Sequence, residues 1–163
     1  MNSAGLKGII LVLVGLPGSG KTTLSEKLEA EGWLVFDDYK ANAIDGCSHF
    51  RKSKYFESLL VSLHAGRNCV VADVDFCKAE ARTEAEQVLR DEVPDMEVRW
   101  IYFSNDIASC EANIRHQKGR NFEDRLTAIY RYSSQYTIPS GAEVRSVVLW
   151  SASTGDGASA RGL

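Results

Sequence analysis

The segment GLPGSGKT at residues 15–22 is a complete phosphate-binding loop of the pattern G-x-x-x-x-G-K-[ST]. The apolar residues 8–14 precede it, and the helix-like sequence KTTLSEKLEAEG begins at its last two residues. Strand, loop and helix in this order form the context that such a loop requires. The segment therefore predicts an α/β protein in which the loop binds the phosphates of a nucleotide.

The residue types of the loop match this chemistry. Glycines at 15, 18 and 20 let successive amide N–H groups point at phosphate oxygens, beside the positive end of the following helix. Lys21 is expected to reach the β- and γ-phosphates, and the Thr22 hydroxyl to hold Mg²⁺. The expected nucleotide-binding residues are Gly15, Leu16, Pro17, Gly18, Ser19, Gly20, Lys21, Thr22 and Thr23.

Length and composition indicate one globular domain. The chain has 163 residues, of which 44% are hydrophobic and 25% charged, and a net charge of −3 gives no general attraction to polyanions. The four cysteines at 47, 69, 77 and 110 show neither a C-x-x-C pair nor zinc spacing, which indicates reduced thiols, with Cys69 and Cys110 in the core. The first apolar run is too short for a signal peptide or a membrane span. We therefore expect a cytoplasmic protein without a membrane partner.

Strand-like and helix-like segments alternate along the chain. After the first strand, candidate strands lie at 33–36, 69–72, 98–103 and 144–150, and helical patterns at 21–31, 48–65, 78–91, 106–117 and 121–135. Gly32 and Gly66 stand where helix C-caps are expected. The order predicts a doubly wound, five-stranded parallel sheet flanked by helices over residues 1–150, with ligands at the carboxyl ends of the strands. Residues 151–163 are predicted to be a disordered tail or the remnant of a linker.

A small kinase is the favoured class among proteins with such a loop. A GTPase of the switch type usually carries an N/T-K-x-D motif late in the chain, and the sequence has none. Motor and transporter ATPases need additional domains. A carboxylate just beyond the second strand, at Asp37, would lie across the crevice from the loop, where it can orient an acceptor hydroxyl and take its proton. The alternative is that Asp37 or Asp38 caps the next helix.

The segments GLPGSGKTT and DDYK resemble the kinase domain of phage polynucleotide kinase and the related zeta-toxin-like and AAA_33-type small P-loop kinases. The resemblance implies a fold like that of nucleoside monophosphate kinases, ATP and Mg²⁺ as cofactors, and Asp37 as the catalytic base. It continues at residues 70–76 with Arg82 and at a basic lid within 110–120, so it covers roughly residues 8–140. Lys40 stands where the family has Arg, and an ammonium cannot grip a phosphate in two places as a guanidinium does.

A carboxylate at the end of the third strand is expected to help hold Mg²⁺, usually through water. We favour Asp73 over Asp75 because it follows the strand directly. The alternative is that Asp73 caps the loop and Asp75 is solvated. The lid is expected near 113–121, where Arg115 and Arg120 would stabilise transferred charge and Lys118 adds a third cation. For each of these cations the alternative is a solvated surface side chain.

The acceptor side is expected around residues 45–66. Its predicted substrate-binding residues are Asp38, Lys40, Arg51, Lys54 and Arg82, with Lys52 as a further cation. His49, Phe50 and Tyr55 could stack on a base, although packing is the favoured role of Phe50. The periodic residues Phe56, Leu59, Leu60 and Leu63 indicate core. The segment 136–139 could contact adenine.

These observations predict an ATP- and Mg²⁺-dependent phosphotransferase that moves the γ-phosphate to a hydroxyl group. A polynucleotide or nucleoside 5′-hydroxyl is one candidate acceptor, and a short nucleic-acid end fits the net charge better than a long polymer. A sugar, sugar acid, amino acid or antibiotic is another. A regulatory module that hydrolyses ATP slowly is the alternative outside the kinases.

Overall fold

Apolar strand residues build one parallel sheet in the computed structural model, which describes residues 8–44, 49–119 and 121–150. Within these residues, five strands pair in the order β2-β3-β1-β4-β5, all parallel. The strands are β1 (Ile9–Val14), β2 (Leu34–Phe36), β3 (Cys69–Ala72), β4 (Glu97–Phe103) and β5 (Glu143–Arg145). The predicted doubly wound α/β fold is confirmed.

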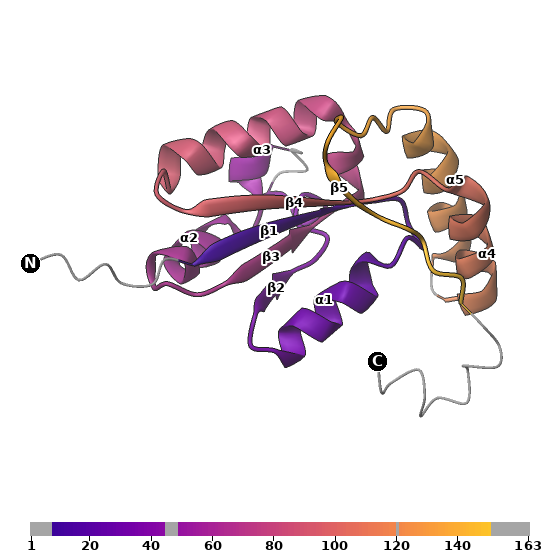
Figure 1. Ribbon diagram of the computed structural model, residues 1–163, viewed down its shortest axis with the longest axis horizontal. Helices are drawn as coiled ribbons and strands as arrows, with labels where there is room; N and C mark the ends of the chain where they lie inside the picture. Colours follow the sequence, from indigo (N-terminus) through magenta and orange to yellow (C-terminus); the bar gives the residue numbers. More distant parts are fainter. Residues whose placement is uncertain (1–7, 45–48, 120, 151–163) are drawn as a thin grey trace, which may run out of the picture.

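Helices connect the strands and cover both faces of the sheet. They are α1 (Lys21–Ala30), α2 (Phe56–His64), α3 (Ala79–Glu92), α4 (Ile107–Gln117) and α5 (Phe122–Ser133), with short 3₁₀ helices η2 (Phe50–Lys52) and η3 (Val74–Cys77). Figure 1 shows α3 along one face of the sheet and α1 along the opposite face, with α4 and α5 gathered where β1 leads into the phosphate loop.

The alternation of side chains along β1 supplies both cores. Ile10 and Val12 belong to the larger core, to which α2, α3, α4 and α5 contribute, whereas Leu11 and Leu13 pack toward Leu24 of α1. Five of the six β1 residues are buried, as expected for a central strand that is covered on both faces. This burial holds the carboxyl end of β1 rigidly in the middle of the sheet, where the phosphate loop begins.

Two predicted elements are shorter than expected. The strand predicted at 144–150 is limited to Glu143–Arg145, and residues 146–150 leave the sheet and run along α4. The helix predicted at 48–65 is divided, because Ser53 separates η2 from α2 and accepts a hydrogen bond from the Tyr55 amide at 3.1 Å. Apolar periodicity alone could not locate either break, since one depends on hydrogen bonds to Asn113 of α4 and the other on hydrogen bonds of Ser53.

Three of the four cysteines lie in the core. Cys69, Cys77 and Cys110 are free and buried, which confirms the predicted core positions of Cys69 and Cys110, while Cys47 lies outside the described residues. Residues 151–163, predicted to be a tail, also lie outside them. None of the described helices has the length and apolar character to cross a bilayer.

Candidate active site

The phosphate loop adopts a backbone that only glycine accommodates. Gly18 and Gly20 have φ values of 80° and 113°, in the left-handed region, and Gly20 immediately precedes α1. A Cβ on Gly18 would lie 2.6 Å from the backbone oxygen of Cys110 in α4. The loop is therefore shaped by its own glycines and by the close approach of α4.

The polar groups of the loop fit a triphosphate. Lys21 Nζ donates to the carbonyl oxygens of Gly15 at 2.6 Å and Leu16 at 3.0 Å. Burial lowers the pKa of Lys21, and the nearby Asp37 carboxylate partly opposes this shift. The Ser19 hydroxyl is buried without a hydrogen-bond partner among the described residues, and a phosphate oxygen would satisfy it. The amino end of α1 adds its positive partial charge.

Asp37 lies directly after β2 and is half-buried. Its Oδ1 accepts a hydrogen bond from the Asp38 amide at 2.9 Å. Residues 37–42 form turns, so no helix begins directly after Asp37 or Asp38, and the alternative that either of them caps the next helix is wrong. Partial burial and the neighbouring carboxylates Asp37 and Asp73 raise the pKa of Asp38, whose φ is 49°. A compact acidic group thus lies at the carboxyl ends of β2 and β3.

Asp73, at the end of β3, holds this edge of the sheet together. Its Oδ2 accepts from the amides of Lys40 at 2.8 Å and Ala41 at 3.0 Å, and its Oδ1 accepts from the Asp75 amide at 2.8 Å. The side chain therefore caps η3, as the alternative to a metal role proposed, and also fixes the chain after β2. Its contact with Mg²⁺ stays a prediction. The described residues contain no group of three or more His, Cys, Asp or Glu side chains arranged to hold a metal.

Lys40 and Asp75 form a buried ion pair rather than solvated side chains. Lys40 is 5% exposed, and its Nζ lies 2.7 Å from Asp75 Oδ2 and 3.6 Å from Glu84 Oε1. Lys78 Nζ contacts the other Asp75 oxygen at 2.9 Å. Burial raises the pKa of Asp75, but hydrogen bonds from Lys40 and Lys78 outweigh burial and lower it overall. The alternative that Asp75 is solvated is therefore wrong.

The side chains of Arg82 and Tyr136 donate hydrogen bonds to backbone carbonyl oxygens. Arg82 is buried and donates to the carbonyl oxygens of Phe76, Cys77 and Thr137 at 2.8–2.9 Å. The Tyr136 hydroxyl donates to the carbonyl oxygens that end β1 and β4. The polar groups of both side chains are thus bonded inside the fold, while a substrate contact of Arg82 and an adenine contact of the segment 136–139 stay predictions.

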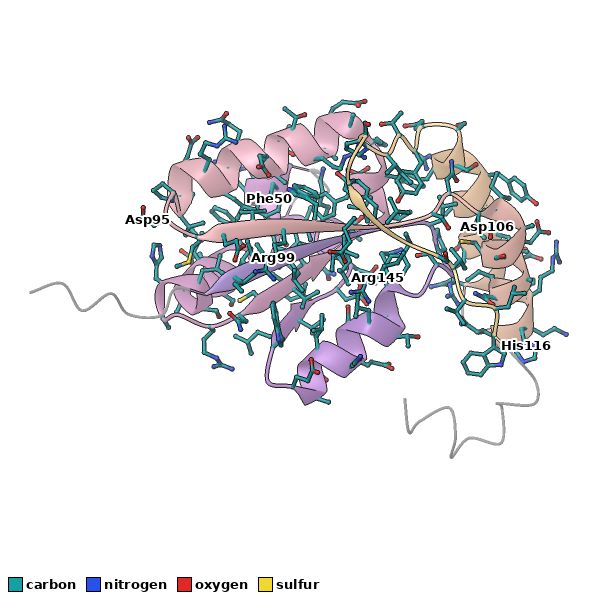
Figure 2. All side chains as sticks on the ribbon, viewed as in Figure 1. Phe50, Asp95, Arg99, Asp106, His116 and Arg145 are labelled. Carbon is teal, nitrogen blue, oxygen red and sulfur yellow. The ribbon has the colours of Figure 1, made fainter. Side chains whose placement is uncertain are left out.

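The other predicted acceptor-side residues lie on the side of the sheet covered by α3. Phe50 is fully buried below α3, which confirms its packing role (Figure 2). Arg51 pairs with Glu92 and lies over the Phe56 ring at 5.7 Å, while Lys52 and Lys54 are exposed. His49 is exposed, with its Nδ1 3.1 Å from Glu84. Tyr55 packs on Phe36 and Tyr39 and is half-buried, so of these three rings His49 is the most open to solvent.

The lid segment is only partly described. Arg115 is exposed and bonded to Glu111 at 3.0 Å, one turn earlier in α4, and Arg120 lies outside the described residues. Sequence reasoning missed Arg125, on the first turn of α5. Its Nη2 donates to Gln117 Oε1 at 3.1 Å, and its positive charge weakly opposes the rise in the pKa of Asp38. No motif marks Arg125, and only its place just after the lid could have suggested it.

Asn113 is a second residue that the sequence did not reveal. It is buried in α4, and its Nδ2 donates to the carbonyl oxygens of Gly18 and Val148, both at 2.9 Å. Its Oδ1 accepts from the Trp150 amide at 2.5 Å. The Trp150 ring lies 5.7 Å from His116, which Figure 2 labels near the end of α4. A polar residue on the apolar face of a helix was the available signal.

Comparison with solved structures finds the same fold. Similar chains include a gluconokinase from Sinorhizobium meliloti 1021, with 18% identity over 89% of this chain and 85% of that chain and a TM-score of 0.58. A fungal RNA kinase has 14% sequence identity over 88% of this chain and 76% of that chain, with a TM-score of 0.58. A sugar kinase from Janibacter sp. HTCC2649 has 15% sequence identity over 85% of this chain and 84% of that chain, with a TM-score of 0.55. At these identities the likeness establishes the fold alone.

Comparison with protein families reaches further than the fold. No curated protein matches the chain significantly. The model of the AAA_33 family, described as an AAA domain, matches residues 10–135, which include the phosphate loop, the acidic edge of the sheet and α4. The predicted resemblance to AAA_33-type proteins is thereby confirmed, and the chain belongs to the AAA_33 family.

Proposed function

We propose that this protein is an ATP- and Mg²⁺-dependent kinase that transfers the γ-phosphate of ATP to a hydroxyl group. The observation that carries the proposal is the joint position of the phosphate loop and Asp37. Asp37 directly follows β2, and β2 pairs in parallel with β3, which pairs in parallel with β1, so the carboxylate and the phosphate loop after β1 lie at the same carboxyl edge of the sheet. A nucleotide-binding loop alone does not require a carboxylate on that side of the crevice.

Each residue of the site has a role in this reaction. The loop amides, Ser19 and Lys21 would bind the phosphates, and the exposed Thr22 hydroxyl on the first turn of α1 would hold Mg²⁺. The metal neutralises charge on the phosphates when it is bound. Asp37 would orient the acceptor hydroxyl and accept its proton. Transfer leaves the phosphoryl group on the acceptor oxygen and ADP in the loop.

A basic group above the site would stabilise the charge that spreads over the transferred phosphoryl oxygens. Arg125 is the described cation whose charge reaches the acidic edge from the lid side. Arg115 and Arg120 remain predicted lid residues. The gluconokinase, the sugar kinase and the RNA kinase of the same fold support a kinase by analogy, and the acceptor named for each belongs to that protein.

The test follows labelled γ-phosphate from ATP to a panel of sugars, sugar acids, nucleosides, aminoglycosides and DNA or RNA 5′-hydroxyl ends. Asp37→Asn should lower transfer by about 10²- to 10⁴-fold while nucleotide affinity changes little, because general base catalysis contributes on this order. Asp91→Asn, an exposed aspartate of α3, is the matched control and should retain activity. Slow phosphate release to water alone, equal in the wild type and Asp37→Asn, would contradict the kinase and favour a regulatory module.

A further inference from the structure

A hollow of about 410 Å³ lies beside the acidic edge of the sheet. Its lining residues are Lys40, His49, Asp75, Lys78, Glu80, Ala81 and Glu84. Two of these residues, Lys40 and Asp75, donate their backbone amides to Asp73 at the end of β3, so the hollow adjoins the carboxyl edge of the sheet where Asp37 also lies. Its walls come from the chain after β2, from the residue before η2, from η3 and from the first turns of α3.

The ammonium groups in this hollow are already neutralised. Lys40 contacts Asp75 at 2.7 Å, and Glu84 lies 3.6 Å away, while Lys78 contacts the second Asp75 oxygen at 2.9 Å. Lys40 is also 5% exposed. A phosphate or carboxylate on the acceptor would have to break these pairs and leave Asp75 unpaired and largely buried, which is costly.

The charge balance of the residues that line the hollow also disfavours an anionic acceptor. Two lysines face three carboxylates, and Glu80 is an exposed carboxylate that forms no ion pair with any other residue of the described part of the chain. Arg51 of η2, a predicted substrate-binding cation, is paired with Glu92. With Asp37, Asp38 and Asp73 at the adjoining edge, an incoming anion meets net negative charge. Hydroxyl and ammonium groups, by contrast, donate hydrogen bonds to carboxylates.

We infer that the acceptor is a polyhydroxylated small molecule without negative charge, a neutral or amine-bearing polyol, whose hydroxyl and amino groups donate to Glu80 and Glu84. The inference rests on the proposed function, because it names the acceptor class of that reaction. It excludes a sugar acid and a nucleoside 3′-phosphate as the preferred acceptors. Lys40, where the family pattern has Arg, serves in this structure to position Asp75 and Glu84 rather than to bind a substrate phosphate.

Acceptors that share a skeleton but differ in charge test the inference. Glucose, glucosamine and gluconate form one set, and adenosine with adenosine 3′-phosphate another. We expect the uncharged or cationic member to exceed the anionic member by at least tenfold, both in kcat/KM with labelled ATP and in calorimetric affinity. The preference should shrink as salt is raised. Preference for the anionic members, or binding of no member, would overturn the inference.

A charge-neutralising variant assigns the discrimination to this hollow. Glu84→Gln keeps an oxygen that can accept from the Phe50 amide, now at 3.2 Å from Glu84, but removes one negative charge. It should reduce the preference against the anionic member by about threefold or more, and Glu57→Gln, an exposed glutamate of α2, should leave it unchanged. An unchanged preference in Glu84→Gln would also overturn the inference. Transfer that favours the anionic acceptor and still requires Asp37 would do so while leaving the kinase intact.

Discussion

The substitution Asp73→Asn separates a positioning role from a metal-binding role. In the structure this carboxylate accepts three backbone amides, from Lys40, Ala41 and Asp75, at 2.8–3.0 Å. An asparagine can keep the two bonds at one oxygen, but its NH₂ group then faces the remaining amide donor. The variant therefore loses one bond to a charged acceptor and places two donors opposite each other.

The size of the effect follows from these contacts. A hydrogen bond to a charged group contributes about 1.5–3 kcal/mol, and the opposed donors add to the loss, so the free energy of unfolding should fall by about 2–4 kcal/mol. For a domain of this size that corresponds to a decrease in Tm of about 4–16 °C. The loss should be the same in EDTA and in Mg²⁺, because the interaction partners of Asp73 are backbone amides.

Urea unfolding of the nucleotide-free protein measures the loss, with Asp91→Asn as an exposed control. A carboxylate whose main role is to hold a metal would show the opposite pattern. Removing its charge from the group that includes Asp37 and Asp38 would then leave stability unchanged or raised in EDTA, and the apparent affinity for Mg²⁺ in the presence of ATP would fall. That result would refute the positioning role argued from the geometry of Asp73.

Three further predictions concern other contacts. Asp75→Asn should lower the free energy of unfolding by about 1–3 kcal/mol at pH 7 and by progressively less toward pH 3. The reason is that the pKa of Asp75 is lowered from its ordinary 3.8, so the stabilisation by its charge is lost as the pH falls through the folded-state pKa. A loss independent of pH in urea titrations would contradict this. Asn113→Asp should lower the free energy of unfolding by about 2–4 kcal/mol and weaken ATP binding, since a carboxylate would face the carbonyl oxygens of Gly18 and Val148. An unchanged calorimetric affinity for ATP would argue against the link between Asn113 and the phosphate loop. Burial raises the pKa of Cys69 and Cys110 to about 11 and that of Cys77 to about 12. All three thiols should therefore react with a disulfide reagent only after unfolding, which peptide mass spectrometry can show. Rapid labelling of the native protein would contradict this prediction.

The fold was accessible from sequence because its determinants are local and repeated. Apolar runs such as 8–14 and 69–72 are bounded by glycine or aspartate, and the helices between them leave parallel pairing as the consistent arrangement. The boundaries that failed depend on contacts across the fold. Residues 146–150 are apolar enough to read as strand, but hydrogen bonds to Asn113 hold them against α4 instead.

The candidate site was predictable only as far as residue type determines a role. The glycines at 18 and 20 have few uses other than the backbone they adopt, so the phosphate loop could be located to the residue. A charged side chain near a strand end has several possible roles. Arg82 satisfies backbone carbonyls, Lys40 neutralises Asp75, and only the three-dimensional contacts distinguish these roles from substrate binding.

Lys40 also limits what a family pattern can say about the substrate. A guanidinium at this position could keep two donors for a phosphate while a third bonded to a carboxylate, whereas a lysine has a single charged nitrogen. Here that nitrogen lies between Asp75 and Glu84 in a nearly closed environment. Lysine in place of the family's arginine therefore removes a group that could bind a phosphate in two places. It also leaves Glu84 able to accept hydrogen bonds from the donors of an uncharged acceptor. Conversely, Lys40→Arg should raise the relative activity toward anionic acceptors, and a variant that folds but shows no such shift would indicate that the discrimination arises elsewhere.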